Sequence, residues 1–287
     1  FIMALQGSGQ ISLANIQTEF GGSNPISISE YYRNGAYVTS NNTGVPISGV
    51  LALTSFYGAV KQFSFTISTN YSTPQNLATL ATAAGWNGSD YLVATNNAII
   101  SSNTTATPAL TIPNSFPNGV ALINNGYIVG MGGRGGAAEG NGGTRAGYTG
   151  GAALSILRTV SITNNGTLAG GGGGGGSSTS FGWSGTILTG GGGGGASGLT
   201  AAIAGFCYYN STAQPSQYNA TTGMYSTGGA TSPGYISGVV APQAGYGGSW
   251  GTAGGGGGYG GGAGGAAVSG NSYVTWVATG TRYGALV

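Results

Sequence analysis

The sequence contains no histidine, one cysteine (Cys207) and only ten fully charged side chains, six basic and four acidic. Without histidine there is no imidazole for a Ser-His-Asp triad or for a histidine metal site. A single cysteine cannot form a disulfide within the chain. The net charge of +2 is far below that of a typical nucleic-acid-binding surface. We therefore expect no metal and no nucleic-acid partner.

Long apolar segments are also missing. No run of about 20 apolar residues could cross a membrane as a helix, so membrane insertion is not expected. The first five residues lack the basic region and apolar stretch of a signal peptide. At the same time 40% of the residues are apolar and 10% aromatic, which is not the composition of a disordered chain. These features predict a folded protein with a largely neutral surface.

Enzyme motifs are present only by chance. Residues 130–135 satisfy G-x-G-x-x-G, but more glycines follow instead of a helix, and no acidic residue follows Glu139. The only lysine, Lys61, does not belong to a phosphate-binding loop. The four acids are too widely spread to predict a pair for glycoside cleavage. The sequence therefore indicates a protein that is not an enzyme and needs no cofactor.

Residues 1–60 are predicted to form a small N-terminal module. Two Ser-Gly segments, beginning at Ser8 and Ser48, repeat at forty residues, and Ser12 or Thr54 is expected to cap a short helix. Between them, residues 26–33 begin with two-residue alternation and turn at Asn34-Gly35. So short a segment cannot bury a large core alone, so it is expected to attach to a partner or to oligomerise.

Residues 61–123 are predicted to form a β domain of short strands. Apolar and polar residues alternate over 63–67, as in a half-buried strand. Residues 77–84 are expected to form one short helix that ends at Gly85. Residues 271–287 contain another alternating segment, which predicts a closing strand that returns to this domain.

Residues 124–270 hold 50 of the 63 glycines, and glycine is about three times as frequent in the whole chain as on average. Segments 122–130 and 161–170 share an apolar strand, Asn-Asn-Gly, a second apolar strand and then glycine. The Asn-Gly pairs are expected to supply the positive φ angles of a tight turn. The repeat predicts an ordered alternation of strands and glycine runs.

The glycine runs at 170–176, 190–195 and 254–258 have two interpretations. One is a flexible linker. The other is a bundle of polyglycine-II helices, which have three residues per turn and must bond to neighbouring segments because they make no internal hydrogen bonds. Several runs recur at intervals and are flanked by apolar residues at strand spacing, which favours the bundle. Collagen is excluded because there is no strict Gly-X-Y period.

The segments between the glycine runs are rich in aromatic residues. A rigid scaffold that presents variable loops is common in binding proteins, and Tyr, Ser, Gly and Asn are typical of paratopes. Half or more of these aromatics could simply cover the glycine scaffold. Arg134 and Arg145, which bracket Glu139 in the first glycine-rich stretch, could be solvated surface charges; the alternative is that they contact an anionic sugar or phosphate, which arginine suits. The candidate receptor-binding residues are Phe181, Trp183, Tyr208, Tyr209, Tyr218, Tyr225, Tyr235, Tyr246, Trp250, Arg134 and Arg145.

This alternation of glycine runs and aromatic loops resembles the tail-fibre tip adhesins of T-even-like bacteriophages and other glycine-rich tail fibre proteins. The resemblance implies a polyglycine-II sandwich over 124–270 whose loops contact a bacterial outer-membrane protein or polysaccharide. It also implies location in the virion and other tail or fibre proteins as partners. Segment 28–35 looks like segments common in phage tail proteins, so 1–60 is expected to be the virion or fibre attachment module.

Two other functions remain open from the sequence. The first is a structural tail or fibre protein without direct receptor contact. The second is an ice-binding polyglycine bundle, which the bulky, irregular loops disfavour. The oligomeric state is also open, with a homotrimer among the assemblies considered.

Overall fold

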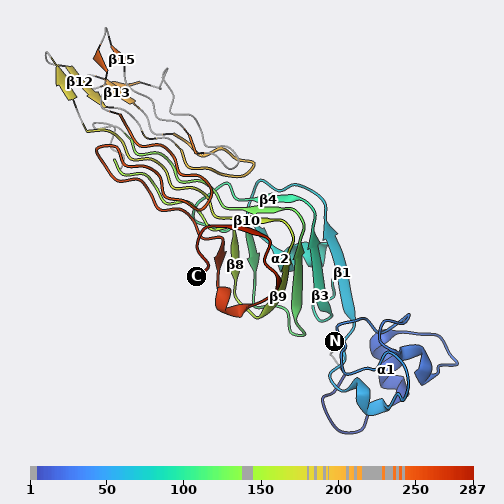
Figure 1. Ribbon diagram of the computed structural model, residues 1–287. Coiled ribbons are helices and arrows are strands. Elements are labelled where there is room, and N and C mark those ends of the chain that lie inside the picture. Colours follow the sequence, from blue (N-terminus) through green and yellow to red (C-terminus); the bar gives the residue numbers. More distant parts are fainter. Residues whose placement is uncertain are drawn as a thin grey trace. The chain divides into compact units, whose positions relative to one another are not determined.

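In the computed structural model the chain folds into two compact units (Figure 1). Unit 1 contains 1–66, 78–95 and 114–121, and unit 2 contains 67–77, 96–113 and 122–287. The structure describes residues 5–137, 145–179, 181–183, 186–189, 192, 194–204, 207–209, 212–214, 228–229, 235–236, 239–240 and 243–287. Within these residues, no helix is long and apolar enough to cross a bilayer.

Unit 1 begins with the α-helix α1 (Leu13–Phe20) and two 3₁₀-helices, η1 (Ile28–Tyr31) and η2 (Leu53–Phe56). The predicted cap at Ser12 is confirmed: its hydroxyl accepts from the Asn15 N–H, and Asn15 Oδ1 accepts from the Ser12 N–H at 2.9 Å. The predicted cap at Thr54 is wrong. Helix η2 starts after Ala52, which has no side-chain acceptor, and Thr54 lies inside the helix.

The alternation at 26–33 also gives a helix. The Ser27 hydroxyl accepts from the Ser29 N–H and the Glu30 carboxylate accepts from the Ser27 N–H, so local capping bonds replace strand pairing. The turn at Asn34-Gly35 is confirmed. Asn34 has a φ of 68°, and the Gly35 N–H donates to the Tyr32 carbonyl at 3.0 Å.

The core of the N-terminal module is aromatic. The Phe56 ring lies 6.4 Å from the Phe20 ring and 6.4 Å from the Tyr31 ring, centroid to centroid. Ile16 and Val38 are fully buried in the same cluster. The rest of unit 1 includes most of β1 (Gln62–Ile67), α2 (Leu77–Ala83) and β3 (Tyr91–Asn96), and the start of β6 (Val120–Asn124), with strand order β1-β3-β6. The strand at 63–67 and the helix before Gly85 are therefore confirmed.

Glu19 is a buried carboxylate in unit 1, 3% exposed. Burial raises its pKa, and the charge of Asp90 adds to the effect, although the Lys61 N–H donates to Glu19 Oε1 at 2.7 Å. A raised folded-state pKa means that this group stabilises the fold below its unfolded pKa. The contribution is lost as the pH rises through the raised value.

The variant Glu19→Gln is therefore expected to flatten the pH dependence of unit 1 stability. Glutamine keeps an oxygen that accepts from Lys61 N–H but cannot ionise. We expect the wild-type melting temperature to fall more steeply between pH 4 and pH 8 than that of the variant. Glu30→Gln also removes one carboxylate and is the control. Equal slopes for wild type and Glu19→Gln would contradict the prediction.

Unit 2 is a parallel β-helix with three faces. Three successive turns visit the faces in the same order: β5, β6, β7, then β8, β9, β10, then β17, β18, β19. The sheets run β17-β8-β5-β2, β6-β9-β18 and β19-β10-β7-β4. The bounds are β2 Gln75–Asn76, β4 Ile99–Ser101, β5 Leu110–Ile112, β7 Tyr127–Val129, β8 Leu154–Ile156, β9 Val160–Asn164, β10 Thr167–Ala169, β17 Val268–Ser269, β18 Val274–Ala278 and β19 Thr281–Tyr283, with η3 at Asn271–Tyr273.

Apolar side chains stack inside this β-helix. Leu110 pairs in register with Leu154, and Ile128 with Leu168, and all four are fully buried. The forty-residue repeat therefore corresponds to neighbouring turns whose like residues pack on each other. The strand expected near the C-terminus is β18.

The Asn-Asn-Gly segments join strands of different sheets. Neither Gly126 nor Gly166 has a positive φ, so the expected tight turn with positive φ angles is wrong. Glycine is needed here because the backbone of the neighbouring turn is too close for a side chain. A Cβ on Gly126 would lie 2.1 Å from the Ala98 carbonyl oxygen, and a Cβ on Gly166 would lie 2.1 Å from the Gly126 carbonyl oxygen. Stacking of the turns, and not the local turn type, selects the residue.

The asparagines of these segments form two ladders. The inner ladder is buried: Asn96 Nδ2 donates to Asn124 Oδ1 at 2.8 Å, and Asn124 Nδ2 donates to Asn164 Oδ1 at 2.7 Å. In the outer, exposed ladder, Asn125 Nδ2 donates to Asn97 Oδ1 at 2.9 Å and accepts from Asn165 Nδ2 at 2.9 Å. Amide groups suit both positions because each is a donor and an acceptor.

Candidate functional site

The glycine-rich segments all leave the β-helix at the same corner. At this corner the glycine-free connection from β4 to β5 is short, residues 102–109. The connections from β7 to β8 and from β10 to β17 are the glycine-rich segments 130–153 and 170–267. The hydrogen bonds of the β4-β7-β10-β19 sheet continue into the two longer ones. The Gly130 N–H donates to the Ala169 carbonyl at 2.8 Å, and the Gly170 N–H donates to the Tyr283 carbonyl at 2.9 Å. The β-helix therefore starts these segments side by side.

The run 170–176 is buried among other glycine-rich segments and bonds to several of them. Its carbonyl oxygens accept hydrogen bonds from three neighbouring segments in turn. Those of residues 170, 173 and 176 accept from segment 245–251 (N–H of Gly251, Gly248 and Gly245). Those of 171 and 174 accept from segment 262–265 (Gly265 and Gly262), and those of 172 and 175 accept from segment 133–136 (Gly133 and Gly136). Its N–H groups donate to other segments, for example Gly174 to Tyr148 and Gly173 to Thr252 at 2.9 Å each. The main chain thus supplies the contacts that side chains make in an ordinary core.

No side chain fits in this run. A Cβ added at any residue from 170 to 176 would lie 1.9–2.0 Å from a backbone carbonyl oxygen of a neighbouring segment. The run must therefore be all glycine for the segments to pack.

Short antiparallel strands follow the glycine runs. The strands β11 (Phe181–Trp183), β12 (Thr186–Thr189), β13 (Cys207–Tyr209) and β14 (Thr212–Gln214) form one sheet in that order, and β15 (Tyr235–Ile236) pairs with β16 (Val239–Val240). In Figure 1 the labelled strands β12, β13 and β15 lie at the end of the glycine-rich segments away from β8 and β10.

Five candidate residues belong to these strands. Phe181, Trp183, Tyr208, Tyr209 and Tyr235 have described backbones, whereas their side chains lie outside the description. The register places Phe181 opposite Leu188 and Leu188 opposite Tyr209. Tyr218 and Tyr225 lie outside the described residues.

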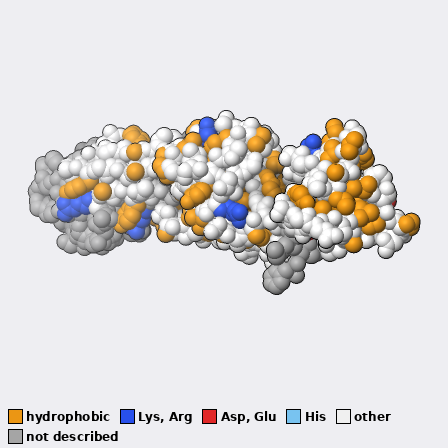
Figure 2. All heavy atoms as spheres, turned by 90° about the horizontal axis from the view of Figure 1, so that it is seen from below, with side chains coloured by type: hydrophobic (Ala, Val, Ile, Leu, Met, Phe, Trp, Pro, Cys, Tyr) orange, Lys and Arg blue, Asp and Glu red, His pale blue; other side chains and the backbone are white. Residues whose placement is uncertain are grey.

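The other four candidates are in different surroundings. Tyr246 is 53% exposed, and its hydroxyl accepts from Gln243 Nε2 at 3.0 Å. The Arg145 guanidinium lies 5.1 Å from the Tyr259 ring centroid and donates to its hydroxyl. Arg134 is half-buried in its glycine-rich segment, and Trp250 is only 9% exposed. Figure 2 shows the basic side chains of one face as separate spots on a mostly neutral surface.

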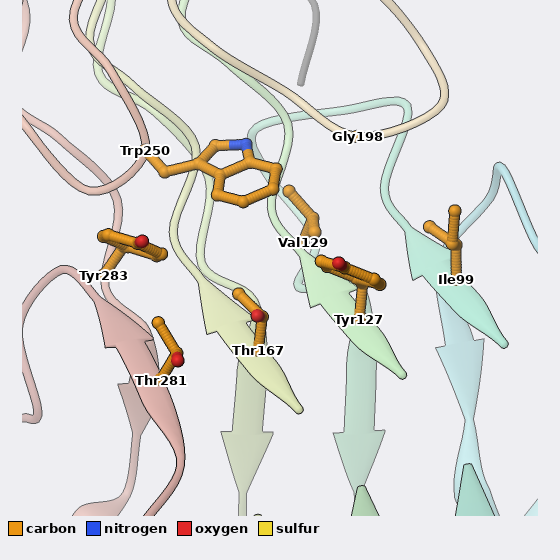
Figure 3. Close-up of a pocket in the computed structure, with 8 residues that line it drawn as sticks. All are labelled: Ile99, Tyr127, Val129, Thr167, Gly198, Trp250, Thr281 and Tyr283. Atoms are coloured by element: carbon orange, nitrogen blue, oxygen red, sulfur yellow. The ribbon is translucent and has the colours of Figure 1, made fainter. Parts of the chain in front are cut away.

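Trp250 forms the wall of a cavity of about 550 Å³ (Figure 3). Its ring lies 6.4 Å from that of Tyr127 and 5.7 Å from that of Tyr283, centroid to centroid. The two tyrosines are 46% and 44% exposed. The remaining lining residues are Ile99, Val129, Thr167, Gly198 and Thr281.

No sequence pattern predicted this cavity. Tyr127 lies on β7 and Tyr283 on β19, more than 150 positions apart, and only the β-helix register brings them to one face. The one available signal was the position of Tyr127 directly after Asn-Asn-Gly, where a repeat of strands implies stacking.

The chance dinucleotide motif has no structural support. Residues 130–135 run into the glycine-rich segment, and the described part of the chain that follows them, up to residue 137, contains no helix. Across the described ranges, no group of three or more Cys, Asp or Glu residues gathers as metal ligands would.

Comparison with known proteins gives a family and a fold. The family model of the phage tail fibre adhesin Gp38 matches residues 62–287. None of the curated proteins matches the sequence. The structure of the gp37-gp38 adhesin tip complex of the bacteriophage S16 long tail fibre contains a chain with the same fold: the TM-score is 0.60, the identity is 23%, and the match covers 98% of this chain and 95% of that chain.

Proposed function

Because this chain belongs to the phage tail fibre adhesin family Gp38, which places it in the tail fibre of a virion, we propose that it recognises a bacterial surface receptor through the aromatic loops between its glycine runs. The family inferred from the sequence is thereby confirmed. The observation that supports the loop proposal is the hydrogen-bonded packing of 170–176, because segments held by their neighbours along their length can carry loops stiffly. Pre-organised loops lose less conformational entropy on binding.

We further propose that the glycine runs are polyglycine-II helices. Residues 170, 173 and 176 accept from one neighbour, whereas 171 and 174 accept from a second. A repeat of three residues is that of a helix with three residues per turn and no internal hydrogen bonds. The fold class is then a parallel β-helix from which a polyglycine bundle projects at one corner.

The proposed role is non-enzymatic, since the family is one of adhesins. Its partners are a bacterial outer-membrane protein or polysaccharide and other fibre proteins; the S16 neighbour is itself described as a complex of gp37 and gp38. Residues 1–60, which precede the matched region 62–287, are proposed as the attachment module. A homotrimer remains a prediction. A structural role without receptor contact is the alternative.

Replacing Trp183 and Tyr208 together by alanine is expected to reduce adsorption to host cells by about tenfold or more, because aromatic side chains dominate interface energies. Adsorption of purified chain or virions to host envelopes measures the effect, before and after protease treatment or polysaccharide removal. Tyr273→Ala removes a tyrosine that is 47% exposed on η3 and is the control. Unchanged adsorption of the double variant with normal fibre assembly would favour the structural role.

A further inference from the structure

The cavity beside Trp250 combines three aromatic rings from separate parts of unit 2. Figure 3 shows Trp250 above the space between Tyr283 and Tyr127, with Thr167 between the two tyrosines and Thr281 beside Tyr283 on the same strand. Tyr127, Thr167 and Thr281 form one row across β7, β10 and β19. Aromatic faces therefore border a floor of hydroxyl groups.

The Trp250 ring is held in place by the close packing of the adjacent backbone and by contacts of the ring itself. Gly251 has a φ of 66°, and a Cβ there would lie 2.2 Å from the Gly284 backbone nitrogen. Trp250 Nε1 donates to the Ser197 carbonyl at 3.4 Å, and Val129, Ala169 and Ala196 pack with the ring. The wall of the cavity is thus formed before any ligand arrives.

We propose that this cavity binds one pyranose ring of a neutral glycan, at a site separate from the aromatic loops. The electron-rich faces of Tyr127, Trp250 and Tyr283 attract the C–H groups of a sugar ring. The hydroxyls of Thr167 and Thr281 can donate to and accept from sugar hydroxyls. Among the described residues, no side-chain hydrogen bond occupies either threonine hydroxyl.

The charge and size of the cavity define the ligand class. None of the lining residues that the structure describes carries a charge. Arg282, next to two lining residues, stacks on Trp276 with its guanidinium 4.9 Å from the ring centroid. A volume of about 550 Å³ is within the range of small-molecule sites. An acidic sugar or a phosphate would find no counter-charge among these residues, whereas a neutral ring finds both stacking surfaces and hydroxyl partners.

The test is saturation-transfer NMR and titration calorimetry with the purified full chain and the methyl pyranosides of glucose, galactose, mannose and N-acetylglucosamine. We expect at least one pyranoside to bind. Tyr127→Ala and Tyr283→Ala should each weaken that binding about tenfold or more, because aromatic side chains in contact with a ligand carry much of the binding energy. Both rings are nearly half exposed, so each variant should fold, and thermal unfolding checks this.

Two controls separate this site from the receptor-binding loops. Tyr273→Ala and the Trp183, Tyr208 double variant should bind the pyranoside like the wild type. Loss of binding in the double variant alone would move the sugar site to the loops and overturn the proposal. Absence of binding to all four pyranosides would also overturn it, as would binding that Tyr127→Ala and Tyr283→Ala leave unchanged. If those two variants lose association with fibre proteins while no sugar binds, the cavity is a protein contact instead.

Discussion

Gly174→Ala is expected to prevent the glycine-rich region from packing. A Cβ on Gly174 would lie 1.9 Å from the Arg134 carbonyl oxygen, and both groups belong to backbone that is hydrogen-bonded to further segments. The clash can be relieved only by separating the segments, which breaks main-chain bonds and leaves buried polar groups without partners. We expect a loss of about 3 kcal/mol or more in the free energy of unfolding.

Gly260→Ala is the matched control for this variant. It makes the same chemical change in the same region, but among the described residues beyond its two chain neighbours no atom lies within 4 Å of the added Cβ. It should express, melt and adsorb to cells like the wild type. Soluble yield, thermal unfolding and protease resistance measure both variants. If Gly174→Ala behaved like Gly260→Ala, the tight packing of the run at 170–176 would be refuted.

Asn124→Ala is expected to destabilise the β-helix strongly. Asn124 is fully buried, and its amide both accepts from Asn96 and donates to Asn164. Removing it takes the acceptor from one Asn96 Nδ2 hydrogen and the donor from Asn164 Oδ1, and also removes the longer, 3.3 Å bond to the Thr167 carbonyl. The two groups of Asn96 and Asn164 that lose a partner each cost about 1–3 kcal/mol, so the expected loss is about 2–6 kcal/mol.

Asn125→Ala distinguishes burial from hydrogen bonding. Asn125 makes the same two amide bonds with Asn97 and Asn165, but in the exposed ladder, where water can replace the lost partner. Its loss should cost no more than about 0.5 kcal/mol. Denaturant unfolding of both variants gives the comparison. Equal destabilisation would show that burial is not what makes the inner ladder important.

Local sequence patterns predicted the elements better than their pairing. The Ser12 cap and the strand at 63–67 depend on neighbouring residues, and both are confirmed. The local rule for Asn-Gly predicts a tight turn with positive φ at the Asn-Asn-Gly segments, and this prediction is wrong. Their conformation is set by stacking on the turn below, which brings Ala98 against Gly126 from outside the segment. The cavity formed by Tyr127, Trp250 and Tyr283 could not be predicted either, because these residues also meet only when the turns stack.

The sequence alone indicated the family and the need of the glycine runs to bond to one another, because both follow from composition and short repeats. Only the tertiary structure showed that segments 130–153 and 170–267 leave from one corner of a β-helix. Only it placed Trp250 between two tyrosines. The physical reason is that both arrangements depend on the register of parallel strands from different turns. Register is fixed by the stacking of buried side chains far apart in the sequence.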